Sequence, residues 1–283
     1  MQIIISRNLK NLQKVLNDYR KKNETIGLVP TMGSIHKGHL ALVEKSKKIS
    51  SKTVVTIFVN PTQFNNKKDY LSYPKNEKDD VALLKKIGVD IIFIPKIKEI
   101  YPPDFCTSIS LSTYQNILCG KYRQNHFSGV ATIVVKLFSI IKPNYGFFGE
   151  KDYQQYMIIK KVFKDLNIDV KLKLIKTVRD SKGLALSSRN LLLTKEETIK
   201  AQNLNLIIRK IISNKKNYVG EVLKIIKKKF ENIGIDKTEY IEIRSTKDLH
   251  LAKDKDKIGK GKYRIFISVY IGKIRLIDNF KIT

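Results

Sequence analysis

Two histidines three positions apart are the first candidates for a chemical role in this sequence. His36 and His39 lie in VPTMGSIHKGHL (residues 29–40), into which the apolar stretch TIGLVPT runs, and the whole chain has only four histidines. At a helix start they would share one face, beside free backbone N–H groups and the positive end of the helix dipole. Polyphosphate binds well there, and protonated imidazoles could stabilise a departing pyrophosphate. A helix start without such a role is the alternative.

Two further polar clusters follow apolar stretches. NPTQF supplies Asn60 and Gln63, whose neutral amides could hold hydroxyls or a carboxylate, although Asn-Pro also starts ordinary turns. GEKDYQQ supplies Lys151 as a phosphate-binding ammonium, and Asp152 as either a ribose contact or a helix N-cap. Gln155 would lie one turn into the next helix and point back at the same crevice.

The remaining candidates each have two interpretations. LSSRN (186–190) offers two hydroxyls and an arginine that could close over triphosphate oxygens, or it is a serine-rich turn. Arg123 and His126 are either an anion contact or a pair within a loop. Asp79 and Asp80 either face a magnesium–phosphate complex or simply start a helix.

Strand and helix patterns alternate around these candidates. The pattern predicts strands at 25–31, 53–59, 90–95, 145–149 and 169–178, and helices at 38–50, 75–88, 128–142 and 153–166. Gly88 is a suitable end for the second helix. Such alternation predicts a Rossmann-like α/β fold with a doubly wound parallel sheet. Because ligands of such sheets bind beyond the carboxyl ends of the strands, the four polar clusters should collect there.

From about residue 177 the pattern changes to a smaller α+β domain. Lysine-rich helices are expected at 195–213 and 217–232, followed by a strand in TEYIEIRS and a hairpin with Gly272 near its turn. We therefore expect two domains, residues 1–176 and residues 177–283.

Composition narrows the class of protein. The chain of 283 residues lacks an early signal-peptide pattern and an apolar run of membrane-spanning length, so no membrane partner is expected. Cys106 and Cys119 have no metal-ligand spacing, which favours a cytoplasmic protein without disulfides or zinc.

The net charge of +29 raises the question of nucleic-acid binding. It arises from 46 lysines and only 9 arginines, and these are spread along the whole chain. A nucleic-acid protein usually concentrates basic residues and uses arginine forks. We therefore expect no nucleic-acid partner, although the charge should help to attract anionic substrates.

Five motifs together resemble one family. PTMGSIHKGH, IFVNPTQF, YPKNEKDD, FFGEKDYQQ and GLALSSRN occur in order, and the chain is similar to the pantoate–β-alanine ligases from about residue 25 to LIDNF near its end. HxGH alone would indicate only the wider nucleotidyltransferase superfamily. The resemblance implies that ATP, pantoate and β-alanine give pantothenate, AMP and pyrophosphate through a pantoyl adenylate, with pantoate and ATP bound by the first domain. It also implies that residues 177–283 are a C-terminal lid, and it implies a homodimer and a requirement for Mg²⁺.

The resemblance also implies roles for individual residues. His39 would be the catalytic acid, Gln63 would bind pantoate and β-alanine, and Gln155 would bind pantoate. The ATP-binding residues would be Met32, Gly33, Ser34, Ile35, His36, Lys37, Gly38, His39, Gly149, Glu150, Lys151, Asp152, Val178, Leu186, Ser187, Ser188 and Arg189.

Departures from the family pattern are few. Thr62 stands where methionine is common, Lys37 is at a variable position, and Cys119 lies where an acidic residue is expected. Two rival functions stay open: another nucleotidyltransferase, which substrate-dependent pyrophosphate exchange would separate, and a nucleic-acid-binding module, which only the net charge supports.

Overall fold

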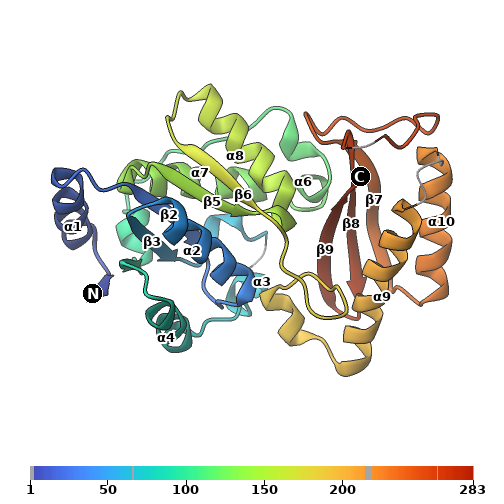
Figure 1. Cartoon of the computed structure of the whole chain (residues 1–283), viewed down its shortest axis with the longest axis horizontal. Helices are drawn as coiled ribbons and strands as arrows, with labels where there is room; N and C mark the ends of the chain where they lie inside the picture. The colour runs from blue at the N-terminus through green and yellow to red at the C-terminus, as the bar shows by residue number, and fades with distance from the viewer. Residues whose placement is uncertain (1–2, 66, 214–217, 260, 283) are drawn as a thin grey trace. The chain divides into compact units, whose positions relative to one another are not determined.

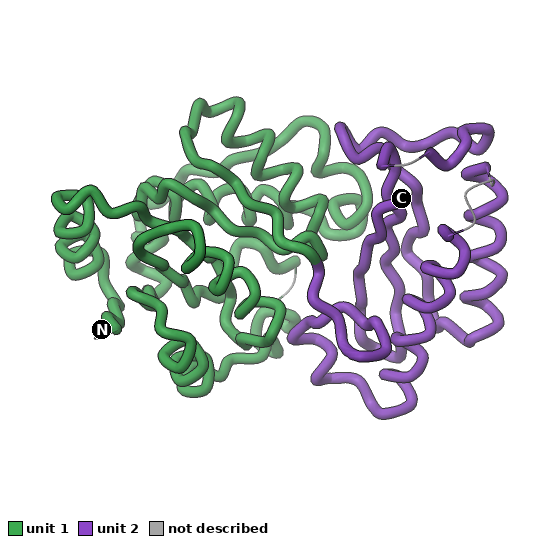
Figure 2. Tube along the Cα trace, in the orientation of Figure 1, with its two compact units in different colours: residues 1–176 green, residues 177–283 purple. Residues whose placement is uncertain are grey.

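The structure is a computed structural model that describes residues 3–65, 67–213, 218–259 and 261–282. The chain divides into two compact units, Met1–Lys176 and Thr177–Thr283, which Figure 2 distinguishes by colour. Within the described residues, no helix is both long and apolar enough to cross a membrane.

The first unit contains a six-stranded parallel sheet, as the alternating pattern predicts (Figure 1). Its order is β1-β4-β3-β2-β5-β6, so the chain winds outward in both directions from the boundary between β2 and β5. All residues of β3 are buried, and β2 is nearly so, because helices cover both faces of the sheet. The strands are β1 Ile4–Ser6, β2 Ile26–Thr31, β3 Lys52–Ile57, β4 Ile91–Phe93, β5 Tyr145–Gly149 and β6 Lys171–Ile175.

Helices pack on the two faces as two groups. α2 packs with α4 on one face, whereas α7 packs with both α1 and α8 on the other. The helices of this unit are α1 Leu9–Lys21, α2 Lys37–Ile49, α3 Lys67–Leu71, α4 Glu77–Ile87, α5 Ile97–Ile100, α6 Cys119–Tyr122, α7 His126–Ile141 and α8 Tyr153–Asp165. Short 3₁₀ turns are η1 Pro61–Gln63, η2 Tyr114–Asn116 and η3 Glu150–Asp152.

Several element ends differ from the predicted ones for local reasons. Helix α4 is ended by Gly88, as predicted. Gly88 takes the left-handed conformation (φ +73°), and its N–H donates to the carbonyls of Leu84 and Lys85. The strand predicted at 169–178 is shorter in the structure, where it is β6, because its pairing with β5 stops at Ile175. β1 and α1 were not predicted; a strand of three residues shows too little periodicity, and it exists by pairing with β4.

The second unit is an antiparallel sheet with two helices. β7 (Lys237–Ser245), β8 (Tyr263–Ile271) and β9 (Ile274–Lys281) pair in chain order, and Gly272 turns the β8–β9 hairpin with φ +56°. α9 (Lys195–Ile212) and α10 (Val219–Asn232) share an apolar core with this sheet, and η4 covers Ser188–Leu192. Residue 217, the predicted first residue of α10, lies outside the described residues.

Candidate active site

Three of the predicted polar clusters follow three adjacent strands. β2 pairs with β3 on one side and with β5 on the other, so the segments after these strands begin side by side at one edge of the sheet. The segment after β2 carries both histidines, the one after β3 carries Gln63, and the one after β5 carries Lys151. A direct contact joins two of them, since Gln63 Nε2 lies 2.8 Å from Met32 Sδ.

The two histidines cap their own helix. His36 is the N-cap of α2, and its Nδ1 accepts a hydrogen bond from the Gly38 N–H at 3.1 Å. His39 Nδ1 in turn accepts from the backbone N–H of His36 at 3.4 Å, and the ring centroids are 4.1 Å apart. Because Nδ1 is an acceptor in both rings, each neutral imidazole carries its proton on Nε2. The pair therefore presents two N–H donors beyond the helix start.

Burial and the nearby positive charge favour the neutral form of both rings in the free protein, in contrast to the expectation of protonated imidazoles. Burial, followed by the charge of Lys151, lowers the pKa of His36 to about 4. Burial, then His36 and Lys151, lowers the pKa of His39 to about 3. Neutral N–H groups, together with the lysine charge, are therefore what this edge offers to a phosphate at pH 7.

Gly38 is required by the cap itself. A Cβ at this position would lie 2.8 Å from His36 Cε1 and 2.9 Å from its Nδ1, closer than non-bonded atoms approach. The glycine of HxGH thus makes room for the first imidazole, a role that we did not predict.

Asp79 and Asp80, the candidates for a magnesium–phosphate contact, face different partners. The exposed Asp79 carboxylate accepts from Asn76 Nδ2. Asp80 is buried, and its two oxygens accept from the backbone N–H groups of Ser34 (2.8 Å) and Ile35 (2.6 Å). Burial raises the pKa of this carboxyl, and the two backbone hydrogen bonds oppose that shift. Asp80 is thus tied to the histidine loop.

The described residues do not fit a resident metal site. Across residues 3–65, 67–213, 218–259 and 261–282, no three His, Cys, Asp or Glu side chains are grouped so as to hold a metal ion. Asp80, the buried member of the predicted pair, already uses both oxygens.

Asn60 is the centre of the amide cluster after β3. Its side chain is 1% exposed, and its Nδ2 donates to Gln63 Oε1 at 3.2 Å and to the Gly129 carbonyl at 3.1 Å. Its Oδ1 accepts from Tyr101 Oη at 2.8 Å and Thr62 Oγ1 at 3.0 Å. Asn60 thus fixes the orientation of the Gln63 amide, and Tyr101 is a participant that the sequence did not reveal.

Arg123 and His126 contact the backbone carbonyl of Gln63 in the same cluster. His126 Nδ1 lies 2.7 Å from the Gln63 carbonyl oxygen, so this nitrogen carries the proton and donates. Arg123 lies 3.2 Å from His126 Nε2 and 3.8 Å from the Asp69 carboxylate. The two side chains thus contact each other where the chain enters α7, and the anion contact stays a prediction.

Two neighbouring glutamines after β5, Gln154 and Gln155, have different surroundings. Gln154 is buried, and its amide accepts from Cys119 N–H and donates to the Tyr114 and Ile117 carbonyls. Gln155, the predicted pantoate ligand, is half-buried in the first turn of α8. Asp152 occupies the N-cap position of α8, one of its two predicted interpretations, but its side chain makes no cap hydrogen bond and lies 3.8 Å from Lys151 Nζ.

The fourth predicted cluster belongs to the second unit. Leu186 N–H donates to the Val178 carbonyl at 3.0 Å, and Ser187 Oγ accepts from the Arg189 N–H at 3.3 Å. Arg179, beside Val178, forms a two-point ion pair with Asp278 at 2.6 and 2.9 Å. The turn that carries Ser187, Ser188 and Arg189 is therefore anchored to β9.

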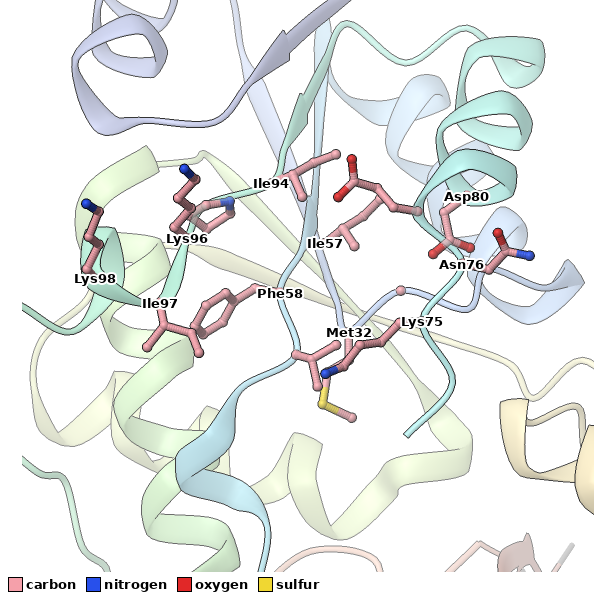
Figure 3. A pocket seen from close by; sticks show the side chains of 14 residues that line it. Met32, Ile57, Phe58, Lys75, Asn76, Asp80, Ile94, Lys96, Ile97 and Lys98 are labelled. Carbon is pink, nitrogen blue, oxygen red and sulfur yellow. The ribbon is translucent and has the colours of Figure 1, made fainter. Parts of the chain in front are cut away.

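A cavity of about 480 Å³ adjoins the loop after β2. Met32, Gly33 and Asp80 line it together with apolar side chains from β3 and the end of β4. Figure 3 shows Lys96 and Lys98 on the opposite side of this cavity from Asp80. The cavity thus reaches the segment immediately before His36.

The parallel sheet, the histidine-capped helix at its switch point and the neighbouring lysine and amides define a nucleotide-binding α/β enzyme. The family model described as pantoate-beta-alanine ligase matches residues 4–281, and this chain belongs to that family. Pantothenate synthetases of Pseudothermotoga lettingae and Caldicellulosiruptor bescii are 44% and 39% identical to it, and each alignment covers 98% of both chains.

Solved structures agree with this assignment. The crystal structure of pantothenate synthetase from Thermus thermophilus superposes with a TM-score of 0.91 at 34% identity, covering 99% of both chains. That of pantoate-beta-alanine ligase from Francisella tularensis, complexed with beta-gamma ATP and beta-alanine, has a TM-score of 0.84 at 40% identity. It covers 99% of this chain and 98% of its own.

Proposed function

We propose that this chain joins pantoate to β-alanine at the expense of ATP, giving pantothenate, AMP and pyrophosphate through a pantoyl adenylate. Family membership and the ATP and β-alanine in the Francisella tularensis complex support the substrates. The structural observation that carries the proposal is the pair of histidines at the start of α2, whose Nδ1 atoms both accept hydrogen bonds from backbone N–H groups so that both Nε2 atoms carry protons, and whose pKa values are both lowered by burial and by Lys151.

In the first step a pantoate carboxylate oxygen attacks the α-phosphorus of ATP, and the bond to the bridging oxygen of pyrophosphate breaks. The Nε2–H groups of His36 and His39 and the ammonium of Lys151 would stabilise the charge that develops on the departing oxygens. Since His39 is neutral in the free protein, we assign it the role of hydrogen-bond donor and not that of an imidazolium acid. The remaining proposed ATP contacts are those of residues 32–38, 149–152, 178 and 186–189.

In the second step the neutral amine of β-alanine attacks the acyl carbon, AMP leaves, and the nitrogen loses a proton. Gln63 is the proposed amide ligand of pantoate and β-alanine, and its orientation is fixed by Asn60. Gln155 is the second proposed pantoate ligand. Closure of residues 177–283 as a lid would exclude water from the adenylate.

Mg²⁺ enters this proposal as part of the metal–ATP substrate. A bound Mg²⁺ would neutralise phosphate charge, and because the described residues do not fit a metal site we assign it no protein ligand. The cytoplasmic location and the homodimer are likewise proposals; the first rests on the cysteine pattern and the second on the resemblance to the family.

Isotope exchange tests the order of the steps. Pantoate alone should support exchange of pyrophosphate into ATP, with β-alanine unnecessary. With ¹⁸O in the pantoate carboxylate, one labelled oxygen should appear in AMP after a full turnover. Label in orthophosphate, with ADP as the other product, would replace the adenylate by an acyl phosphate. Exchange with other acids but not with pantoate would favour a different nucleotidyltransferase.

A further inference from the structure

We propose that Asp80, which touches no substrate in the mechanism above, is the positioning residue for the histidine pair. It would act through the backbone of Ser34 and Ile35. The inference rests on the proposed function where it is tested by enzyme kinetics. The backbone hydrogen bonds themselves can be tested without any substrate.

Asp80 lies in the first turn of α4, 46 positions along the chain from Ser34, yet both carboxylate oxygens are directed at the loop after β2. Oδ2 accepts from Ser34 N–H at 2.8 Å, and Oδ1 accepts from Ile35 N–H at 2.6 Å. The Asp80 residue is only 3% exposed. Hydrogen bonds from N–H groups to an ionised carboxylate are stronger than those between neutral groups. A buried carboxylate without such donors would destabilise the fold.

The loop itself needs such a restraint. Gly33 and Ser34 both have positive φ, +82° and +52°, and a serine in this region costs about 1 kcal/mol. Gly33 also passes close to the carboxylate, since a Cβ there would lie 2.9 Å from Asp80 Oδ2 and 3.2 Å from Ile57 Cγ2. The conformation is thus held between α4 on one side and β3 on the other.

This loop leads directly into the histidine pair. Ile35, whose N–H is bonded to Asp80, is followed by His36, the N-cap of α2. The backbone N–H of His36 then donates to His39 Nδ1. A shift of the Ser34–Ile35 backbone would therefore move the first imidazole and loosen the second. Figure 3 shows Asp80 and Met32 among the side chains that line the same cavity.

The hydrogen bonds also distinguish this role from that of a metal ligand. Each oxygen of Asp80 accepts one backbone N–H, at 2.6 and 2.8 Å, so a Mg²⁺ ion bound there would share its oxygen with an N–H group and compete with it for the carboxylate charge. Positioning predicts that these amides stay protected in the working enzyme.

The test compares Asp80→Asn with Glu77→Gln. Asparagine keeps the size of the side chain, but its NH₂ group must face one of the two N–H donors. Glu77 lies in the same turn of α4, is exposed and pairs with Arg7, so Glu77→Gln removes the same charge without touching the loop. Asp80→Asn should lower kcat for pantoate-dependent ATP–pyrophosphate exchange by about 10-fold to 100-fold, the scale of a small misplacement, and should leave the pantoate KM nearly unchanged. Glu77→Gln should stay within about twofold of wild type.

Amide hydrogen exchange supplies the second readout. In wild type the Ser34 and Ile35 amides should be protected, and in Asp80→Asn at least one should exchange faster while the β2 amides keep their protection. If Asp80→Asn does not fold, slow exchange of both amides in wild type still supports the hydrogen bonds, and fast exchange overturns them.

Three results would overturn the proposal: wild-type kinetics in Asp80→Asn, an equal loss in Glu77→Gln, or recovery of Asp80→Asn on titration with Mg²⁺, which would make Asp80 a metal ligand. Absence of pantoate-dependent exchange in the wild-type protein would instead refute the proposed function. In that case Asp80 would be judged by amide exchange alone.

Discussion

Replacing Asn60 by aspartate should lower stability and weaken pantoate binding. The Asn60 side chain is buried and hydrogen-bonded, and it also holds the amide of Gln63, the proposed pantoate ligand. The change keeps the shape and the Oδ1 acceptor for Tyr101, but turns the Nδ2 donor into a carboxylate oxygen. That oxygen would then face Gln63 Oε1 at 3.2 Å and the Gly129 carbonyl at 3.1 Å, and all three atoms are acceptors.

The magnitude follows from the contacts that are lost. The Gln63 amide should rotate to donate to the new carboxylate, which withdraws its NH₂ group from Met32. The hydrogen bond to the Gly129 carbonyl is then the one that is lost, at about 1 kcal/mol, and the two acceptors left facing each other in a buried place cost about 1–3 kcal/mol more, so the free energy of unfolding should fall by roughly 2–4 kcal/mol. Because the NH₂ group of Gln63 is withdrawn, we expect the pantoate KM to rise by about 10-fold to 100-fold, the factor for roughly 1.4–2.8 kcal/mol, with a much smaller change for ATP.

Urea unfolding and the pantoate dependence of ATP–pyrophosphate exchange measure the two effects. Thr62→Val is the matched control, because it removes the hydroxyl that contacts Asn60 Oδ1 and Tyr101 Oη and keeps the Asn60 Nδ2 donor that holds Gln63; its cost should stay near about 1–2 kcal/mol. An Asn60→Asp protein with wild-type stability and pantoate KM would refute the central role of Asn60. Equal rises in the KM of pantoate and ATP would mean that the two substrates do not divide as proposed.

The other predictions concern the phosphate edge and the net charge. His39→Ala or Lys151→Ala should lower adenylation by roughly 10²–10³-fold with little effect on folding, and wild-type exchange rates would remove that residue from the mechanism. Gly38→Ala should lower adenylation while changing stability by less than about 1 kcal/mol, because the loss of the His36 cap and the preference of the helix for alanine, each about 1 kcal/mol, oppose each other; full activity would show that His36 has room to spare. Since the pKa of His36 (about 4) and of His39 (about 3) lie below the ordinary value near 6.5, the unfolded chain binds protons that the folded chain excludes, and stability should fall as the pH drops from about 6.5 toward 4. A flat urea midpoint over that range, or ring NMR shifts titrating near pH 6.5, would contradict the neutral pair. Duplex DNA and tRNA should bind weakly with a steep salt dependence, and tight sequence-selective binding near physiological salt would reverse the interpretation of the +29 charge.

The class of fold and the places where polar side chains collect follow from the amino-acid sequence alone. The spacing of apolar residues is a local property of the chain. It is enough to predict that β2, β3 and β5 form a parallel sheet and that helices connect them. Because parallel strands bring their carboxyl ends to one edge, the sequence also predicts that the segments of His36, Gln63 and Lys151 meet. The linked motifs then identify the family, which the comparisons confirm.

What each polar side chain does at that edge depends on tertiary packing. The sequence allowed protonated histidines, but burial beside Lys151 makes them neutral. It offered Asp80 as a metal contact, whereas packing of α4 against the β2 loop turns both oxygens to backbone N–H groups. Hydrogen bonds and desolvation depend on atoms tens of residues apart in the chain, and no periodicity records which of those atoms meet.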